Sequence, residues 1–167
     1  PSGVDEKQLK ELHIQFTIVK AQQKEALFEK IVDVLNRDKI EFKIVEHKPV
    51  YTSEEAAQAR GTQLKQGAKA LVCKTDKGFV QAVISAAKEL DAERLKRILQ
   101  TKSVVLASAD EVKEIAGVSV GAVPPFGNLF GISVYVDSSV TANEEIAFNA
   151  GLHTKSIVMG RRDMVRL

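Results

Sequence analysis

The chain has 167 residues, 44% of them hydrophobic and 28% charged, which is typical of one ordinary globular domain. A formal net charge of +2 is too small to bind nucleic acid by overall attraction, so any such contact must come from a local group of Lys and Arg side chains. The single cysteine, Cys73, excludes an intramolecular disulfide, and no apolar run approaches the roughly 18 residues of a membrane-spanning helix, so we expect a soluble protein of the cytoplasm.

The first forty residues are predicted to be helical, because apolar residues recur at helical spacing in two groups. The groups are Leu9, Leu12, Phe16 and Val19, and then Leu27, Phe28, Ile31, Val34 and Leu35. The polar segment 20–24 separates them, which leaves open one long helix or a helical lead-in followed by the first helix of the domain. We favour the second interpretation.

A strand and a short helix are predicted next. The segment Phe42–His47 alternates enough for a strand, and Pro49 ends it because proline lacks a backbone donor and restricts the residue before it. Thr52 and Glu55 form a capping box, with Thr52 as the cap and Glu55 reaching back, which predicts a helix over 54–59.

The middle of the chain carries signals for a β-hairpin and two helices. Segments 68–74 and 79–84 flank the turn residues Asp76 and Gly78, which predicts the hairpin. Further along the chain we expect a helix capped by Asp91, a strand over 103–106, and a helix with a capping box at Ser108 and Glu111 that Gly117 ends.

The last third contains a Gly/Pro loop over Gly121–Gly127 and two predicted strands, Gly131–Val136 and Ser156–Met159. Several predicted strands have no crossover helix between them, which favours antiparallel pairing. The fold class is therefore mixed α+β, with a mixed, largely antiparallel sheet or a barrel surrounded by helices.

Lys69 stands at an unusual position for a charged residue. Under strict alternation it shares a strand face with Leu71 and Cys73, whereas Lys74 lies on the other face, so one of the two lysines must face inward. An inward lysine is costly unless an anion or a carbonyl receives it, which makes it a candidate for phosphate binding. The alternative is that Lys69 lies at a frayed strand end and extends to solvent.

The Gly/Pro loop and two histidines are further candidates. Gly121 permits close backbone approach, and Pro124 and Pro125 restrict the chain, so the loop could direct backbone N–H groups at a developing oxyanion; it could equally be an ordinary connection. His47 and His153 can act as acid, base or phosphate donor, although single histidines are often surface residues. No spacing typical of metal ligands, nucleotide-binding loops or serine nucleophiles occurs, so we expect no metal and no cofactor.

Taken together, several motifs resemble the YbaK/ProX family. They are His47, Thr52–Ala57, Gln66–Val72, Gly121–Gly127 with its G-x-x-x-P-F-G pattern, and Phe148–Gly151, and both their order and their spacing match. This family includes the insertion domain of bacterial prolyl-tRNA synthetases and free-standing relatives that deacylate mischarged tRNA.

The resemblance implies an editing domain over residues 27–167, preceded by a helical extension over 1–26. It implies a trans-editing deacylase that hydrolyses a small mischarged amino acid, such as Ala or Cys, from the acceptor end of a tRNA, above all the proline tRNA. An aminoacyl-tRNA synthetase is a further expected partner. Our alternative is a non-catalytic tRNA- or synthetase-binding module, which the helical extension favours because its apolar stripe needs a covering surface.

By resemblance, Lys69 holds the phosphate or terminal adenosine of the tRNA end, and Lys74 is then the outward lysine. Gly121 and Pro125 belong to a substrate loop whose backbone groups position the aminoacyl carbonyl while water attacks, assisted by a ribose hydroxyl of the substrate. The resemblance further implies substrate-binding roles for Ala122, Val123, Pro124, Phe126, Gly127, His47 and His153. The sequence departs from the family pattern at Ala70, where Thr is common, and at Pro124, which replaces Ser and removes a backbone donor.

Overall fold

The computed structural model describes the backbone of residues 5–166, without the side chains of residues 12, 16, 17, 19–21 and 166. The described helices are α1 (Glu6–Arg37), α2 (Ser53–Arg60), α3 (Ala92–Leu99), α4 (Ala109–Ala116), α5 (Ser138–Thr141) and α6 (Arg161–Arg166), with 3₁₀ turns η1 (Leu64–Gln66) and η2 (Gly127–Phe130). The strands are β1 (Phe42–Glu46), β2 (Ala68–Thr75), β3 (Gly78–Ser85), β4 (Val104–Leu106), β5 (Ser133–Val136), β6 (Glu145–Leu152) and β7 (Lys155–Gly160).

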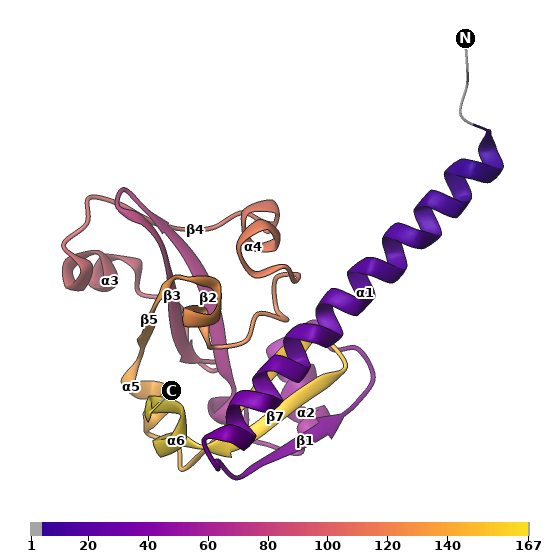
Figure 1. Cartoon of the computed structure of the whole chain (residues 1–167). Helices are drawn as coiled ribbons and strands as arrows, with labels where there is room; N and C mark the ends of the chain where they lie inside the picture. Colours follow the sequence, from indigo (N-terminus) through magenta and orange to yellow (C-terminus); the bar gives the residue numbers. More distant parts are fainter. Residues whose placement is uncertain (1–4, 167) are drawn as a thin grey trace.

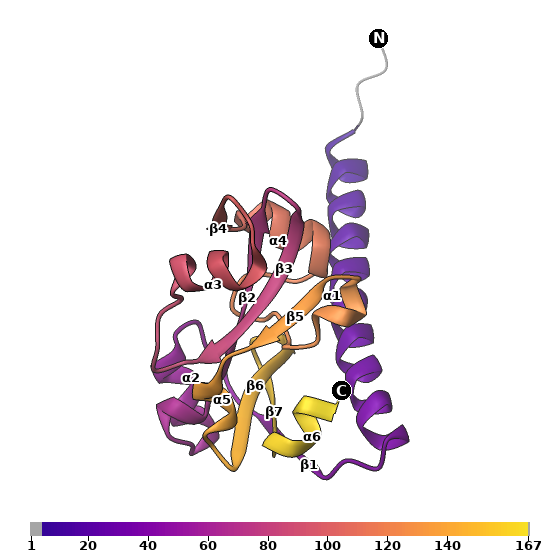
Figure 2. The same cartoon turned by 90° about the vertical axis from the view of Figure 1, so that its left-hand side faces the viewer.

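The strands form two sheets, which Figures 1 and 2 show with helices around them. The small sheet has the order β1-β7-β6 and is antiparallel, and the large sheet has the order β4-β2-β3-β5, in which only β5 runs parallel to its neighbour. The predicted mixed α+β class with largely antiparallel pairing is confirmed. The barrel alternative is wrong, because within the described residues the two sheets are joined by an isolated bridge between Gly67 and Ala147 and do not close.

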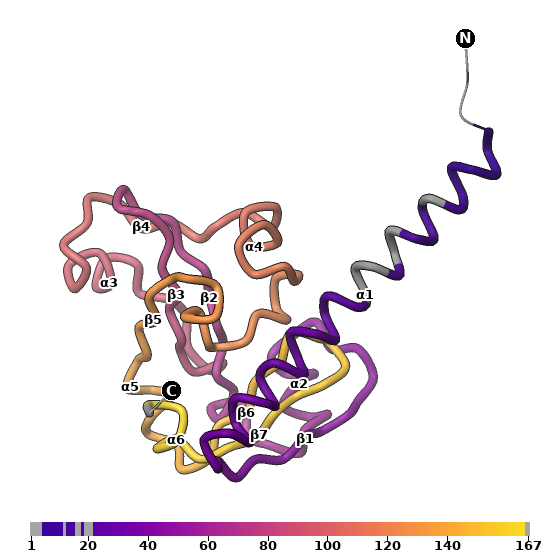
Figure 3. The backbone as a smooth tube through the Cα atoms, viewed as in Figure 1, coloured from indigo at the N-terminus to yellow at the C-terminus, as the bar shows by residue number. Residues whose placement is uncertain are grey.

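The N-terminal helix is one continuous element, so the prediction of two separate helices is wrong. Its trace passes the polar segment 20–24 without a break (Figure 3). The physical reason is that Lys, Ala and Gln are all good helix formers, so a loss of apolar residues there does not end the helix. Of the predicted first stripe, the side chains of Leu12, Phe16 and Val19 lie outside the described residues, and Leu9 is 53% exposed.

The second half of α1 forms the main core with the small sheet. Phe28, Ile31 and Leu35 of α1 are buried in the same cluster as Phe148 of β6 and Ile157 of β7. Before this half, the helix projects beyond the two sheets (Figure 2). The helix therefore has one half that belongs to the core and one half that does not.

The local signals in the middle of the chain are confirmed. The hairpin β2–β3 turns at Asp76 and Lys77, and Asp91 caps α3 by accepting the Arg94 N–H at 2.9 Å. In α4, Ser108 and Glu111 satisfy each other's backbone N–H groups at 3.1 Å, as the capping box requires.

One strand was missed by sequence reasoning. The segment Phe148–Gly151, expected to precede a strand, lies inside β6. The pairing of β6 with β7 is irregular between Asn149 and Leu152, and Gly151 has a positive φ of 88°. An Asn and a Gly at this bulge interrupt the apolar alternation by which a strand is recognised.

Candidate active site

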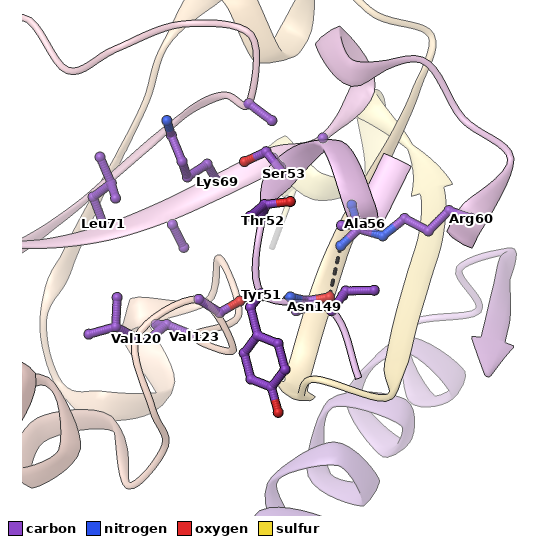
Figure 4. A pocket seen from close by; sticks show the side chains of 16 residues that line it. Tyr51, Thr52, Ser53, Ala56, Arg60, Lys69, Leu71, Val120, Val123 and Asn149 are labelled. Carbon is purple, nitrogen blue, oxygen red and sulfur yellow. Dashed lines mark hydrogen bonds between the residues drawn. The ribbon is translucent and has the colours of Figure 1, made fainter. Parts of the chain in front are cut away.

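A cavity of about 190 Å³ lies between the two sheets, where the start of α2, the start of β2 and the loop after α4 meet (Figure 4). Its lining residues are Val50, Tyr51, Thr52, Ser53, Ala56, Arg60, Gly67, Ala68, Lys69, Ala70, Leu71, Ala86, Val120, Gly121, Val123 and Asn149. This volume is below the roughly 300–1,000 Å³ of sites that enclose drug-sized ligands, so the cavity suits a small chemical group.

One wall of the cavity is an open edge of β2. The carbonyl of Gly67 accepts the Ala86 N–H, which follows β3, and the carbonyl of Val72 accepts the Ala107 N–H on the opposite side. Because backbone direction alternates along a strand, the N–H and C=O groups of Ala70 point away from β3, toward the cavity side. The ladder with β4 begins only at Cys73, so no described strand covers this edge at Ala70.

The first half of the Gly/Pro loop forms the opposite wall. Gly121 has a φ of +87°, a conformation that favours glycine, and its carbonyl accepts the Asn149 Nδ2 at 2.7 Å. Ala122 is fixed through both backbone groups, to the Ser119 carbonyl at 3.1 Å and from the Gly151 N–H at 2.9 Å. Within the described part of the chain, the N–H groups of Gly121 and Val123 have no acceptor, which leaves both available to a ligand.

The second half of the loop lies in the core and does not line the cavity. Pro124 and Phe126 are buried, and the Phe126 ring packs edge-on against Phe148 at 5.3 Å. Gln81, which is fully buried in β3, donates to the Pro124 carbonyl at 3.0 Å and accepts the Gly127 N–H at 2.9 Å. The residues expected here to bind substrate, Pro124, Phe126 and Gly127, therefore support the loop from behind.

Pro125 follows the same pattern. It is buried and lines a different groove, beside β5 and α6, rather than the cavity with Lys69 and Gly121. The resemblance placed these three residues together, and the structure brings only Lys69 and Gly121 to one cavity. Gln81, which the sequence reasoning missed, gave a signal that could have found it: a single amide in the apolar strand of residues 79–84.

The two lysines of β2 differ as predicted in their exposure. Lys74 is the outward one, with its side chain 54% exposed and its Nζ 3.0 Å from Glu111. Lys69 lines the cavity and is half-buried, and its Nζ donates to the Lys88 carbonyl at 2.9 Å. In Figure 4 the Lys69 side chain leaves β2 on the side away from Val123. A single hydrogen bond leaves this long side chain free to change its rotamer.

A second cation, Arg60, enters the cavity from the end of α2. Its Nε donates to the Ser156 hydroxyl and its Nη2 to the Asn149 amide oxygen, both at 2.8 Å, and Figure 4 shows it pointing toward Asn149. Burial lowers the pKa of Arg60 to about 10, so it remains charged at neutral pH. His47 joins this network, with Nε2 2.8 Å from the Ser156 hydroxyl and Nδ1 2.8 Å from the Lys48 carbonyl.

The network connects distant residues to the substrate loop. Asn149 accepts from Arg60 and from Ser156 while it donates to Gly121. His47, expected to bind substrate, does not line the cavity and instead contacts Ser156. The structure therefore gives His47 a positioning contact, two residues removed from the loop.

His153 lies beside the cavity rather than in its wall. Its Nδ1 is 2.9 Å from the Val50 carbonyl, and its ring lies 4.9 Å from that of Tyr51. Tyr51 is 73% exposed and lines the cavity. A Cβ on Gly121 would lie 3.5 Å from His153 Cε1, so His153 packs directly behind the loop.

The site offers backbone donors and two cations but no evident side-chain nucleophile of unusual reactivity. Cys73 is fully buried, and burial raises the pKa of its thiol to about 11, which opposes formation of a thiolate. Across the described residues, no three His, Cys, Asp or Glu side chains gather as metal ligands would. None of the described helices combines the length and hydrophobicity that crossing a membrane requires. The chemistry that fits this set is attack by water on a carbonyl whose oxygen meets backbone N–H groups.

Comparisons with known proteins bear on this chemistry. The family model described as the aminoacyl-tRNA editing domain matches residues 47–167. The multifunctional Ser/Thr-tRNA deacylase ProXp-y of Escherichia coli K12 is 34% identical over 145 residues, which cover 83% of this chain and 86% of that protein. A proline–tRNA ligase of Thermosipho melanesiensis is 30% identical over 108 residues, 65% of this chain but 19% of the ligase.

A solved structure is also similar. A crystal structure of a proposed trans-editing enzyme for prolyl-tRNA synthetase superimposes with a TM-score of 0.69 and 27% identity, covering 74% of this chain and 79% of that one. The similarity therefore extends over both sheets and not only over the motifs around Lys69.

Proposed function

Because this chain belongs to the aminoacyl-tRNA editing domain family, a class of aminoacyl-tRNA hydrolases, we propose that it acts in trans and removes a small, wrongly attached amino acid from the 3′ end of a tRNA. The observation that carries this proposal is the small cavity between Ala70 and the Gly121 loop, which combines unpaired backbone donors with two cationic side chains. The relative of similar length, itself a tRNA deacylase by name, supports action without an attached synthetase.

In the proposed reaction, water attacks the carbonyl carbon of the aminoacyl ester. The negative charge that develops on the carbonyl oxygen is stabilised by the N–H groups of Gly121, Val123 or Ala70, which are held in place before the reaction. The bond from the carbonyl carbon to the ribose oxygen then breaks, the amino acid leaves as a carboxylate, and the ribose hydroxyl regains its proton. Lys69 binds the terminal phosphate or adenosine, and a ribose hydroxyl of the substrate assists the attacking water.

The amino acid removed is limited by the size of the cavity. Ala and Cys on the proline tRNA are our expectation from the sequence, and the name of the relative adds Ser and Thr as candidates. Discrimination by exclusion of a larger side chain is effective, whereas the gain from one extra methylene is only about 1–3 kcal/mol. A prolyl-tRNA synthetase is a natural partner, because related ligases carry a similar segment within their own chain.

The test is deacylation of proline tRNA charged with Ala, Cys, Ser, Thr or Pro, followed as loss of the labelled amino acid. We expect release of one or more small amino acids with Pro left attached, and a fall in kcat/KM of roughly tenfold to a hundredfold in Lys69→Ala, from loss of one charged hydrogen bond. Lys74→Ala, from the same strand but with an outward side chain, is the matched control and should match the wild type.

Binding of tRNA without release of any amino acid would contradict hydrolysis and favour the non-catalytic binding module. Release that is equal in the wild type and in Lys69→Ala would preserve the hydrolase but remove Lys69 from its site.

A further inference from the structure

We propose that Arg60 is the fixed phosphate-binding group of this cavity and that it takes a phosphodiester of the RNA 3′ end, distinct from the group that Lys69 meets. This inference rests on the proposed function, and it adds a binding residue that no motif of the sequence indicated. Four observations carry it: unused donors, the lack of an anionic partner, the rigid setting of the guanidinium, and the charges of the substrate.

The first observation is the number of unused donors. A guanidinium has five N–H groups in a planar fork, and Arg60 uses one for Ser156 and one for Asn149. Among the described residues, the other three have no acceptor, although the side chain lines the cavity. An arrangement of this kind leaves one side of the fork for a bidentate acceptor, and a phosphate fits it.

The second observation is the lack of a counterion. Within the described part of the chain, no carboxylate forms an ion pair with Arg60, whereas Lys74 and Lys155 both have acidic partners. A partly buried cation without an anion is unfavourable, because burial removes water without replacing its charge interactions. Its position at the C-terminus of α2 compensates only in part, since a helix end carries a partial charge. An anionic ligand would complete the site.

The third observation separates Arg60 from Lys69. Arg60 is held by two hydrogen bonds from a network that also fixes Gly121, so its position relative to the loop is defined before any ligand arrives. Lys69 comes from β2 and makes one hydrogen bond to a carbonyl. The two cations enter the cavity from different elements, as Figure 4 shows, so they meet different groups of one ligand.

The fourth observation concerns the substrate. The carboxyl group of an esterified amino acid carries no charge, and its α-ammonium group is a cation that Arg60 would repel. The only anions of an aminoacyl-tRNA end are phosphates, so a cation fixed beside the loop also orients the substrate, with a phosphate toward Arg60 and the ammonium group away from it.

The test is the salt dependence of binding, because each lost phosphate contact to a single strand lowers the slope of log K against log salt by about 0.7. The probe is an uncharged RNA oligonucleotide with the single-stranded CCA end of a tRNA, and affinity is measured by fluorescence anisotropy at several salt concentrations. We expect Arg60→Gln to bind about tenfold more weakly at low salt and to lose about 0.7 of the slope. Arg97→Gln, an exposed arginine of α3, is the control and should keep both values.

Two further variants separate charge from positioning. Arg60→Lys keeps the cation but not the fork, so its slope should stay at the wild-type value even though turnover falls. Asn149→Ala removes the support of Gly121 but no charge, so it should lower turnover and also keep the slope. Thermal unfolding of each variant, followed by circular dichroism, establishes that the chain is folded.

An unchanged slope in folded Arg60→Gln would overturn this inference, and the hydrolase assignment would stand if the wild type releases amino acids. A reduced slope in Arg60→Gln together with no deacylation by the wild type would support the phosphate site while contradicting the proposed reaction. The two proposals therefore fail in different measurements.

Discussion

Gln81 shows how one buried polar residue can fix a loop that backbone pairing does not reach. Both of its amide atoms are used, one at the Pro124 carbonyl and one at the Gly127 N–H, and the side chain is fully buried. A buried amide that satisfies two backbone groups is favourable only as long as all of these groups remain paired.

Gln81→Leu is expected to destabilise the protein by roughly 2–5 kcal/mol, because it leaves one buried carbonyl and one buried N–H without partners. The measurement is the free energy of unfolding in urea, with exposed Gln58→Leu of α2 as the control, which should change it by less than about 0.5 kcal/mol. A loss below about 1 kcal/mol for Gln81→Leu would mean that water replaces the amide and that the loop needs no such support.

Residues of the site differ in how well the sequence could predict them. Lys69 and Gly121 were identified from motifs, and both line the cavity. Arg60 and Asn149 contact each other across 89 positions of the chain, and nothing local to either residue indicates that contact. The loop residues after Val123 were assigned to substrate because a motif gives spacing but does not say which side of the backbone faces the core.

Among the elements, α2 and α4 begin in the same way but differ in what they hold. Thr52 and Ser108 each accept the backbone N–H of the third helical residue at 3.1 Å. In α2, Glu55 reaches back to the Tyr51 N–H, also at 3.1 Å, rather than to the cap residue itself. Both caps satisfy donors that a helix N-terminus leaves unpaired.

Thr52→Ala and Ser108→Ala should each cost about 1 kcal/mol of stability, the usual effect of losing a cap. Only Thr52→Ala should also lower deacylation, because α2 lines the cavity and carries Arg60, whereas α4 does neither. Urea unfolding and initial rates on the two variants check this pair. Equal rates despite equal losses of stability would mean that the start of α2 does not have to be fixed for the reaction.

The elements with local signals were the ones that the sequence could predict. Caps such as Asp91 and turn residues such as Asp76 act within a few positions, so their effect is visible in the sequence. Strand β6 and the separation into two sheets depend on pairing between distant segments, which no short window contains. The continuity of α1 was missed for a different reason, because its polar middle still consists of good helix formers.

At the scale of the whole molecule, α1 joins a packed half to a projecting half. Of the described side chains before residue 24, all are exposed, including Ile14 and Ile18 at 56% and 46%. This pattern supports the proposed division into an extension over 1–26 and an editing domain over 27–167, although the helix itself does not break there.

A chain that begins at residue 23 is expected to keep its Tm within about 3 °C of the full chain and to keep its deacylation rate, since it loses few packing contacts. A chain that begins at residue 33 lacks Phe28 and Ile31 and should lose at least about 3 kcal/mol of stability. Calorimetry and rate measurements on both chains test this. Unfolding of the chain that begins at residue 23 would show that the projecting half belongs to the domain.

The network around Asn149 has a consequence for the protein during its own synthesis. Arg60 and Gly121 are translated long before Ser156 of β7, yet the position of the loop depends on Asn149 and Ser156, which leave the ribosome late. A nascent chain that is still short of β7 therefore has its cations and its loop but not the contacts that align them. Such a chain would be unable to deacylate the correctly charged tRNAs that surround the ribosome at high concentration, so the enzyme becomes active only after its last sheet has formed.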